Sequence, residues 1–190
     1  MCESPDQSRY SRARLDAPSS VSRRHFLQVA AMAAPALLVP GAALADSMAP
    51  RALSFVHTHT SERLSLEYFT GGHYLPDALG ALNRLLRDFR TGDIQPIDPR
   101  LFDLLHALRG QTGAAAPYQI ISGYRSPVTN AALRQRSEGV ASGSLHMRGQ
   151  AIDIRLADVP LADVRRAAVN LRLGGVGYYP GSNFVHVDTG

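Results

Sequence analysis

Two short segments near the C-terminus, SLHMRGQAIDI at residues 144–154 and FVHVD at residues 184–188, carry two histidines and an aspartate. Two imidazoles and a carboxylate are a ligand set of catalytic zinc sites, where the fourth coordination position stays open for water. Zinc lowers the pKa of that water to about 7, which provides a nucleophile at neutral pH. If the two segments meet in space, they predict a zinc hydrolase.

Strand alternation decides which side chains of these segments can meet. Asp153 would lie on the face opposite its isoleucine neighbours, and His186 on the face opposite its valine neighbours. Adjacent strands would then present both residues together, with His146 arriving from the preceding loop. Gly149 would let that loop pass close to the metal. Because a single histidine on a strand is more often an ordinary hydrogen-bonded residue, the metal site is inferred from the convergence of three candidate ligands.

The rest of the chain predicts an α+β fold with an antiparallel sheet and helices packed on one side, because helical patterns come early and strands cluster late. Alternation and turn residues predict strands at 53–57, 64–69, 118–121, 150–155, 175–178 and 184–188. Capping residues and helical spacing predict helices from Pro76 through Phe89, at 99–110, after Pro127, and at 161–173.

All 20 basic residues are arginines, so a Schiff-base or P-loop lysine mechanism is excluded. The basic residues are scattered, and the formal net charge is only +4, so we expect no nucleic-acid partner. The single cysteine, Cys2, lies near the N-terminus, which leaves the rest of the chain without a disulfide or a cysteine zinc ligand.

Residues 1–45 resemble a twin-arginine export signal. Arg23 and Arg24 precede an apolar stretch, and Ala43-Leu44-Ala45 supplies a small-x-small cleavage site. Pro35 and Pro40 interrupt the stretch, so cleavage is favoured over a retained anchor, and no permanent membrane span is expected. We therefore predict a partnership with the twin-arginine (Tat) machinery and a location in the periplasm. A linker at 46–52 and a zinc peptidase domain at 53–190 would follow.

The chain over about residues 53–190 resembles the YcbK-like murein endopeptidases, of the zinc D-Ala-D-Ala carboxypeptidase (hedgehog/DD-peptidase) superfamily. Three segments carry the resemblance: SGYRS at 122–126, S-x-H-M-x-G-x-A-x-D at 144–153, and HVD at 186–188. The resemblance implies a hedgehog/DD-peptidase-like fold, Zn²⁺ as the cofactor, and peptidoglycan stem peptides as the substrate. It makes His146, Asp153 and His186 the zinc ligands.

The resemblance also implies roles around the metal. Arg125 would face the substrate carbonyl or a carboxylate, where a fixed guanidinium stabilises developing negative charge. Tyr124 and Ser144 would contact substrate, although Ser144 could instead hydrogen-bond a ligand or cap a turn. Some superfamily members place a histidine or a glutamate just before the last ligand, where this chain has Phe184 and Asn183.

Asp188 is therefore the predicted general base, and orienting His186 is its alternative role. The missing histidine or glutamate also motivates a rival interpretation, a non-catalytic module that binds wall peptides. A metal-dependent amidase or esterase acting on another exported substrate is a third possibility. His57 and His59 could suggest a second metal site, but hydrogen bonding within a turn is the preferred explanation.

Overall fold

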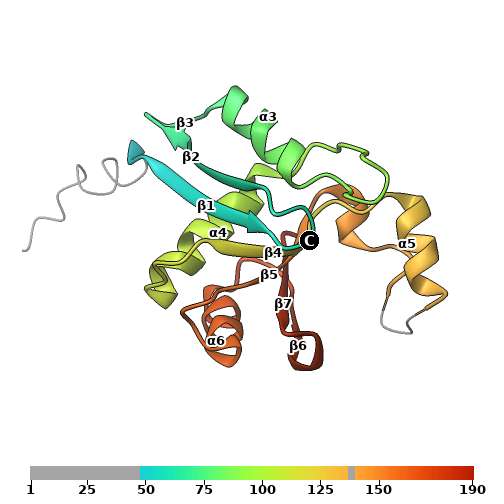
Figure 1. Cartoon of the computed structure of the whole chain (residues 1–190). Coiled ribbons are helices and arrows are strands. Elements are labelled where there is room, and N and C mark those ends of the chain that lie inside the picture. The colour runs from blue at the N-terminus through green and yellow to red at the C-terminus, as the bar shows by residue number, and fades with distance from the viewer. Residues whose placement is uncertain (1–47, 137–139) are drawn as a thin grey trace, which may run out of the picture. The chain divides into compact units, whose positions relative to one another are not determined.

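The computed structural model describes residues 48–136 and 140–190, so the predicted signal peptide at 1–45 lies outside the described residues. Within those ranges one seven-stranded sheet has the order β3-β2-β1-β4-β5-β7-β6 (Figure 1). Its strands are β1 (Arg51–His57), β2 (Arg63–Thr70), β3 (His73–Tyr74), β4 (Tyr118–Ser122), β5 (Ala151–Arg155), β6 (Val176–Tyr179) and β7 (Phe184–Asp188). β1 begins at Arg51, inside the stretch predicted as linker.

Four helices accompany the sheet in the described residues, α3 (Pro76–Leu85), α4 (Pro99–Thr112), α5 (Pro127–Arg134) and α6 (Leu161–Leu171). Two short 3₁₀ turns, η2 (Leu145–Arg148) and η3 (Pro180–Ser182), lie among the later strands. α4 shows how local sequence sets these bounds. The Asp98 side chain accepts the Arg100 N–H at its start, and Gly113 ends it at φ 65°.

The α+β prediction is confirmed. The strand pairs are antiparallel except for β1 and β4, which run parallel. The most important pair for function is β5 with β7, because its register places Asp153 directly opposite His186. The terminal hairpin of β6 and β7 was also predicted, and it places Gly177 opposite His186.

One hydrophobic core joins the sheet to α3, α4 and α6. From the strands it takes alternate apolar residues, among them Phe55, Ile120, Ile152, Ile154, Val185 and Val187. From the helices it takes Leu82, Leu101, Leu105, Leu108 and Val164, among others. α5 lies well away from α4 and α6 (Figure 1), and its buried residues are polar. Because the isoleucines and valines of β5 and β7 face the core, Asp153 and His186 face the other way.

One local prediction was wrong. The helix expected through Phe89 ends at Leu85, because the chain turns there and makes other hydrogen bonds. The Leu86 carbonyl accepts the Tyr124 N–H, and the Asp88 N–H donates to the Asp93 carbonyl. The loop expected to carry His146 contains the short turn η2.

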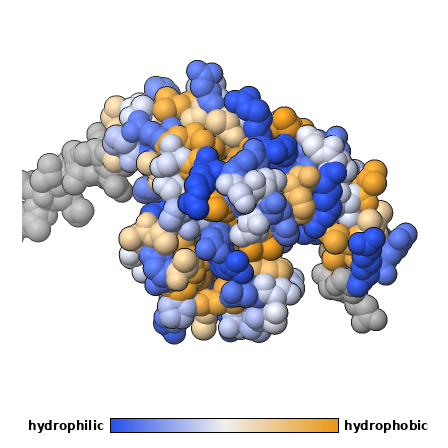
Figure 2. Space-filling model, in the orientation of Figure 1, coloured by the Kyte–Doolittle hydropathy of each residue, from blue (hydrophilic) through white to orange (hydrophobic). Residues whose placement is uncertain are grey.

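The outer surface shows hydrophilic and hydrophobic residues interspersed over the face drawn in Figure 2. Isolated exposed apolar side chains such as Val128 and Leu173 are normal for a globular domain. Within the described ranges, none of the helices has the length and apolar character needed to cross a bilayer.

Candidate metal centre

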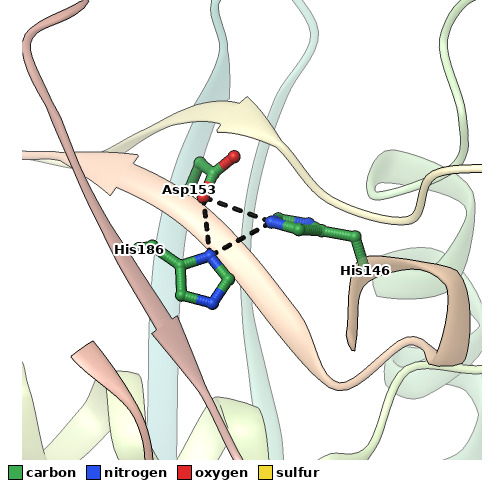
Figure 3. A group of neighbouring side chains, drawn as sticks. All are labelled: His146, Asp153 and His186. Atoms are coloured by element: carbon green, nitrogen blue, oxygen red, sulfur yellow. Dashed lines mark hydrogen bonds and ion pairs between the residues drawn. The ribbon is translucent and has the colours of Figure 1, made fainter. Parts of the chain in front are cut away.

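Three side chains from three separate elements point at one another (Figure 3). Asp153 comes from β5, His186 from β7, and His146 from the turn η2. The Asp153 Oδ1 atom lies 2.9 Å from His186 Nδ1 and 3.2 Å from His146 Nε2. The two ring nitrogens are 3.2 Å apart. This is the metal-ligand cluster found among the described residues, and it consists of the three predicted ligands.

His146 is held by backbone contacts on both sides. The Ser144 Oγ accepts the His146 N–H at 3.4 Å and caps the turn. His146 Nδ1 donates to the Gly123 carbonyl at 2.8 Å. Gly149 ends the turn at φ 67°, and a Cβ there would lie 2.3 Å from the Pro96 carbonyl oxygen. Gly149 is thus required by its approach to Pro96, whereas the sequence suggested an approach to the metal.

His186 is oriented from behind by Asp188. The His186 Nε2 lies 3.1 Å from Asp188 Oδ2, while Asp188 Oδ1 accepts the N–H groups of Gly175 and Gly190 at 2.9 and 3.1 Å. Both carboxylate oxygens therefore have partners, and Asp188 is only 8% exposed.

The tautomers that these contacts favour leave a gap suited to a cation. A ring nitrogen that donates to a carbonyl carries the proton, so His146 Nδ1 is protonated and Nε2 presents a lone pair in the neutral ring. Likewise, His186 Nε2 carries the proton that it donates to the Asp188 carboxylate, which leaves a lone pair on His186 Nδ1. Three lone pairs then converge, with spacings near the roughly 3.3 Å expected around a tetrahedral zinc with bonds of about 2.0–2.1 Å. The residues present therefore fit a zinc ion.

Charge around the cluster favours a bound cation or proton. Burial opposes ionisation of Asp153, but the charges and hydrogen bonds of His146 and His186 outweigh it and hold its pKa well below the usual range. Burial opposes protonation of His186, but Asp153 and Asp188 outweigh it and raise the pKa of that imidazole. Metal binding therefore competes with protonation of His186.

Arg125 lies against the same cluster. Its Nη2 is 3.5 Å from Asp153 Oδ2 and 3.5 Å from Ser122 Oγ, and its backbone N–H donates to the His146 carbonyl at 3.2 Å. Burial lowers its pKa, partly offset by the charge of Asp153. Its Nε is buried and has no hydrogen-bond partner. That donor is unsatisfied among the described residues, and Arg125 also lines the pocket described next.

The cluster opens into a pocket of about 520 Å³. Its lining includes the three cluster residues with Arg125 and Ser144, two of the predicted catalytic and substrate-binding residues. Tyr124 and Asp188 are not in that lining. Tyr124 packs against the hydrophobic core, and Asp188 lies behind His186.

Four further residues line the pocket that the sequence did not identify as part of it, His59, Arg90, Tyr179 and Phe184. Phe184 and Tyr179 stack with ring centroids 4.6 Å apart, a contact that only the hairpin geometry creates.

His57 makes the turn hydrogen bonds that the sequence favoured over a second metal site. Its Nδ1 accepts the N–H groups of His59 and Thr60 at 3.2 and 3.3 Å. His59 instead stacks on Phe89 with ring centroids 4.3 Å apart.

Comparisons with known proteins show the family of this chain. The model of the peptidase family described as peptidoglycan L,D-endopeptidase MepK matches residues 45–190. The peptidoglycan L,D-endopeptidase MepK of Escherichia coli (strain K12) is 46% identical over 171 residues, which cover 89% of this chain and 94% of that protein. A Haemophilus influenzae protein described as "probable peptidoglycan L,D-endopeptidase MepK" is 42% identical over 172 residues, which cover 89% of this chain and 92% of that protein.

Proposed function

Because the chain belongs to the family described as peptidoglycan L,D-endopeptidase MepK, we propose that it is a metallopeptidase that hydrolyses an amide bond in peptidoglycan peptides. Its membership makes it a peptidoglycan hydrolase and so favours an enzyme over a non-catalytic wall-binding module. The relatives are described as L,D-endopeptidases, and we extend that bond specificity to this chain.

The observation that carries the proposal is the convergence of His146 Nε2, Asp153 Oδ1 and His186 Nδ1 within 3.2 Å of one another at the floor of a pocket. Two imidazoles and one carboxylate form a catalytic zinc set, so we propose Zn²⁺ as the metal. A zinc ion held there would supply an activated water and polarise the scissile carbonyl.

The surrounding residues of this chain have separate tasks. Arg125 stabilises negative charge that develops on the substrate oxygen, since its guanidinium lines the pocket beside the cluster. Asp188 fixes the ring of His186 through Nε2, which makes it an orienting residue rather than the base that the sequence suggested. Ser144 holds the turn that carries His146, and it also lines the pocket.

We propose that the protein acts in the periplasm and reaches it by the twin-arginine route. Peptidoglycan, on which the relatives' name says they act, lies outside the cytoplasm, and Arg23 and Arg24 precede an apolar segment. Cell fractionation of the wild type and of an Arg23→Lys, Arg24→Lys double variant tests this route. Retention of only the double variant in the cytoplasm supports it, and equal export of both proteins refutes it.

Digestion of purified sacculi tests the activity itself. We expect the zinc-loaded protein to release peptides whose masses report cleavage at one amide, and a chelator to abolish the release. The His186→Ala variant should be inactive, while His73→Ala, which changes an exposed histidine of β3 outside this pocket, should retain activity. Intact sacculi after incubation with zinc-loaded wild type would refute the proposal.

A further inference from the structure

Two arginines face the pocket from neighbouring loops. Arg125 lies against the metal cluster, and Arg90 belongs to the turn that follows α3. Among the described residues Arg125 forms one ion pair, with Asp153, at the long distance of 3.5 Å. Arg90 forms no ion pair within residues 48–136 and 140–190, and Asp153 is the only acidic residue in the described lining of the pocket. The lining thus has an excess of positive charge.

Arg90 is held in place although its side chain is exposed. Its guanidinium carbon lies 4.1 Å from the centroid of the Phe89 ring, and the His59 ring lies 4.3 Å from the same centroid. Two groups this close to one ring centroid must occupy its opposite faces. Because stacking limits the orientations of the guanidinium, little freedom remains to be lost when it binds a ligand.

A single buried carboxylate fixes the backbone beside both arginines. Asp88, which is 1% exposed, accepts the Arg90 N–H through Oδ1 at 3.0 Å. Its Oδ2 accepts the N–H and the Oγ–H of Ser126, the residue after Arg125, at 2.9 and 2.7 Å. The spacing of the two backbone segments that carry Arg90 and Arg125 is therefore built into the fold.

The positive charges of Arg90 and Arg125 at this pocket repel each other unless a bound anion lies between them. Alongside burial, the charge of Arg90 contributes to lowering the pKa of Arg125. Arg125 also keeps its buried Nε without a partner. A planar carboxylate offers the geometry that a guanidinium recognises best.

We infer that Arg90 and Arg125 form a subsite for a free carboxylate of the peptide substrate, located beside the bond that is cut. This inference rests on the proposed peptidase function and adds a requirement to it. Substrates that carry a carboxylate next to the scissile amide are preferred, and amidation of that group weakens binding. Arg90 is the specificity-determining residue, because Arg125 also serves the reacting carbonyl.

Binding of two matched peptides tests the subsite. Both are stem-peptide fragments whose scissile amide is replaced by a ketomethylene group, and they differ only in a carboxylate or a carboxamide next to it. Calorimetry with the zinc-loaded wild type should show about tenfold tighter binding of the carboxylate peptide, as expected for loss of a charged hydrogen bond. The Arg90→Ala variant should lose this preference, and Arg90→Lys should keep part of it.

The control is Arg166→Ala, which removes an exposed arginine of α6 that lines a different pocket and should leave the preference unchanged. Zinc content shows that each variant keeps the site. Equal binding of both peptides by the wild type, or an unchanged preference in Arg90→Ala, overturns the inference. Sacculus digestion separates the two proposals. If the protein digests sacculi but binds both peptides equally, only this inference fails. If it does not digest sacculi, the proposed function fails.

Discussion

Asp153 lies directly opposite His186 in the antiparallel pair of β5 and β7, and their Oδ1 and Nδ1 atoms are 2.9 Å apart. The backbone hydrogen bonds of the sheet set this register, and the buried isoleucines and valines behind it fix which face the two side chains use. Two ligands of the proposed metal are therefore fixed by the core itself. The third, His146, depends on a loop.

Asp188→Asn distinguishes an orienting role from a general-base role. An amide has one acceptor oxygen, whereas Asp188 accepts through both oxygens, from His186 on one and from Gly175 and Gly190 on the other. Loss of orientation should weaken zinc binding about 10- to 100-fold. Saturating zinc should then restore peptide cleavage to within a few-fold of the wild-type rate. Unchanged zinc affinity with a rate that zinc does not restore would assign Asp188 as the base instead.

Arg125→Lys tests charge stabilisation in the transition state. Lysine keeps the charge but lacks the planar guanidinium that reaches both Asp153 and the pocket. We expect kcat to fall about 100-fold, the size of effect seen when one oxyanion donor is removed. Zinc content should not change, which metal analysis of the same preparation checks. A rate within threefold of the wild type would show that Arg125 has no such role.

Metal stabilisation should increase with pH. The folded-state pKa of His186 is raised, so its protonation stabilises the metal-free protein fully below about pH 6.5, and this contribution is lost as pH rises through the folded value. Zinc requires the neutral ring, so its binding strengthens over the same interval. The zinc-induced rise in Tm should be larger at pH 8 than at pH 6. A rise that is equal or smaller at pH 8 would contradict the assignment of His186 as a ligand.

Gly149→Ala tests how the loop of His146 is held. Gly149 and Gly113 both have left-handed backbone, at φ 67° and 65°, but only Gly149 has backbone atoms where a Cβ would lie. The left-handed conformation costs a non-glycine residue about 1–2 kcal/mol at either position. The contact with Pro96 should add about 1–3 kcal/mol at Gly149. Urea unfolding of Gly149→Ala and Gly113→Ala measures the difference, and equal losses of stability would show that the contact with Pro96 is unimportant.

The sequence predicted most strands, because alternation along a strand is a local property. The convergence of His146, Asp153 and His186 was predicted with the help of the family resemblance, since it joins three separate elements. The sequence could not predict the parallel pairing of β1 with β4, which joins segments about sixty residues apart. The early end of α3 also depends on a distant partner, since the Leu86 carbonyl accepts the Tyr124 N–H. Phe89 fits a helical pattern, but it lies beyond this early end of α3. Its ring therefore stacks between His59 and Arg90.

Asp188 illustrates a similar limit within the site. Alternation places it on the same face as His186, which suggested a group at the metal. The structure turns its carboxylate toward Gly175 and the far nitrogen of His186. A Cβ at Gly175 would lie 2.5 Å from Asp188 Oδ2, so a glycine thirteen positions earlier in the chain makes this arrangement possible.

Zinc stoichiometry after equilibrium dialysis tests the central claim most directly. The wild type should bind one zinc ion per chain, as should His59→Ala, which alters a histidine of the same pocket. Asp153→Asn and His186→Ala should lose the ion while their circular dichroism shows a folded domain. A wild type that binds no zinc, or ligand variants that bind as much as the wild type, would contradict the metal centre described above.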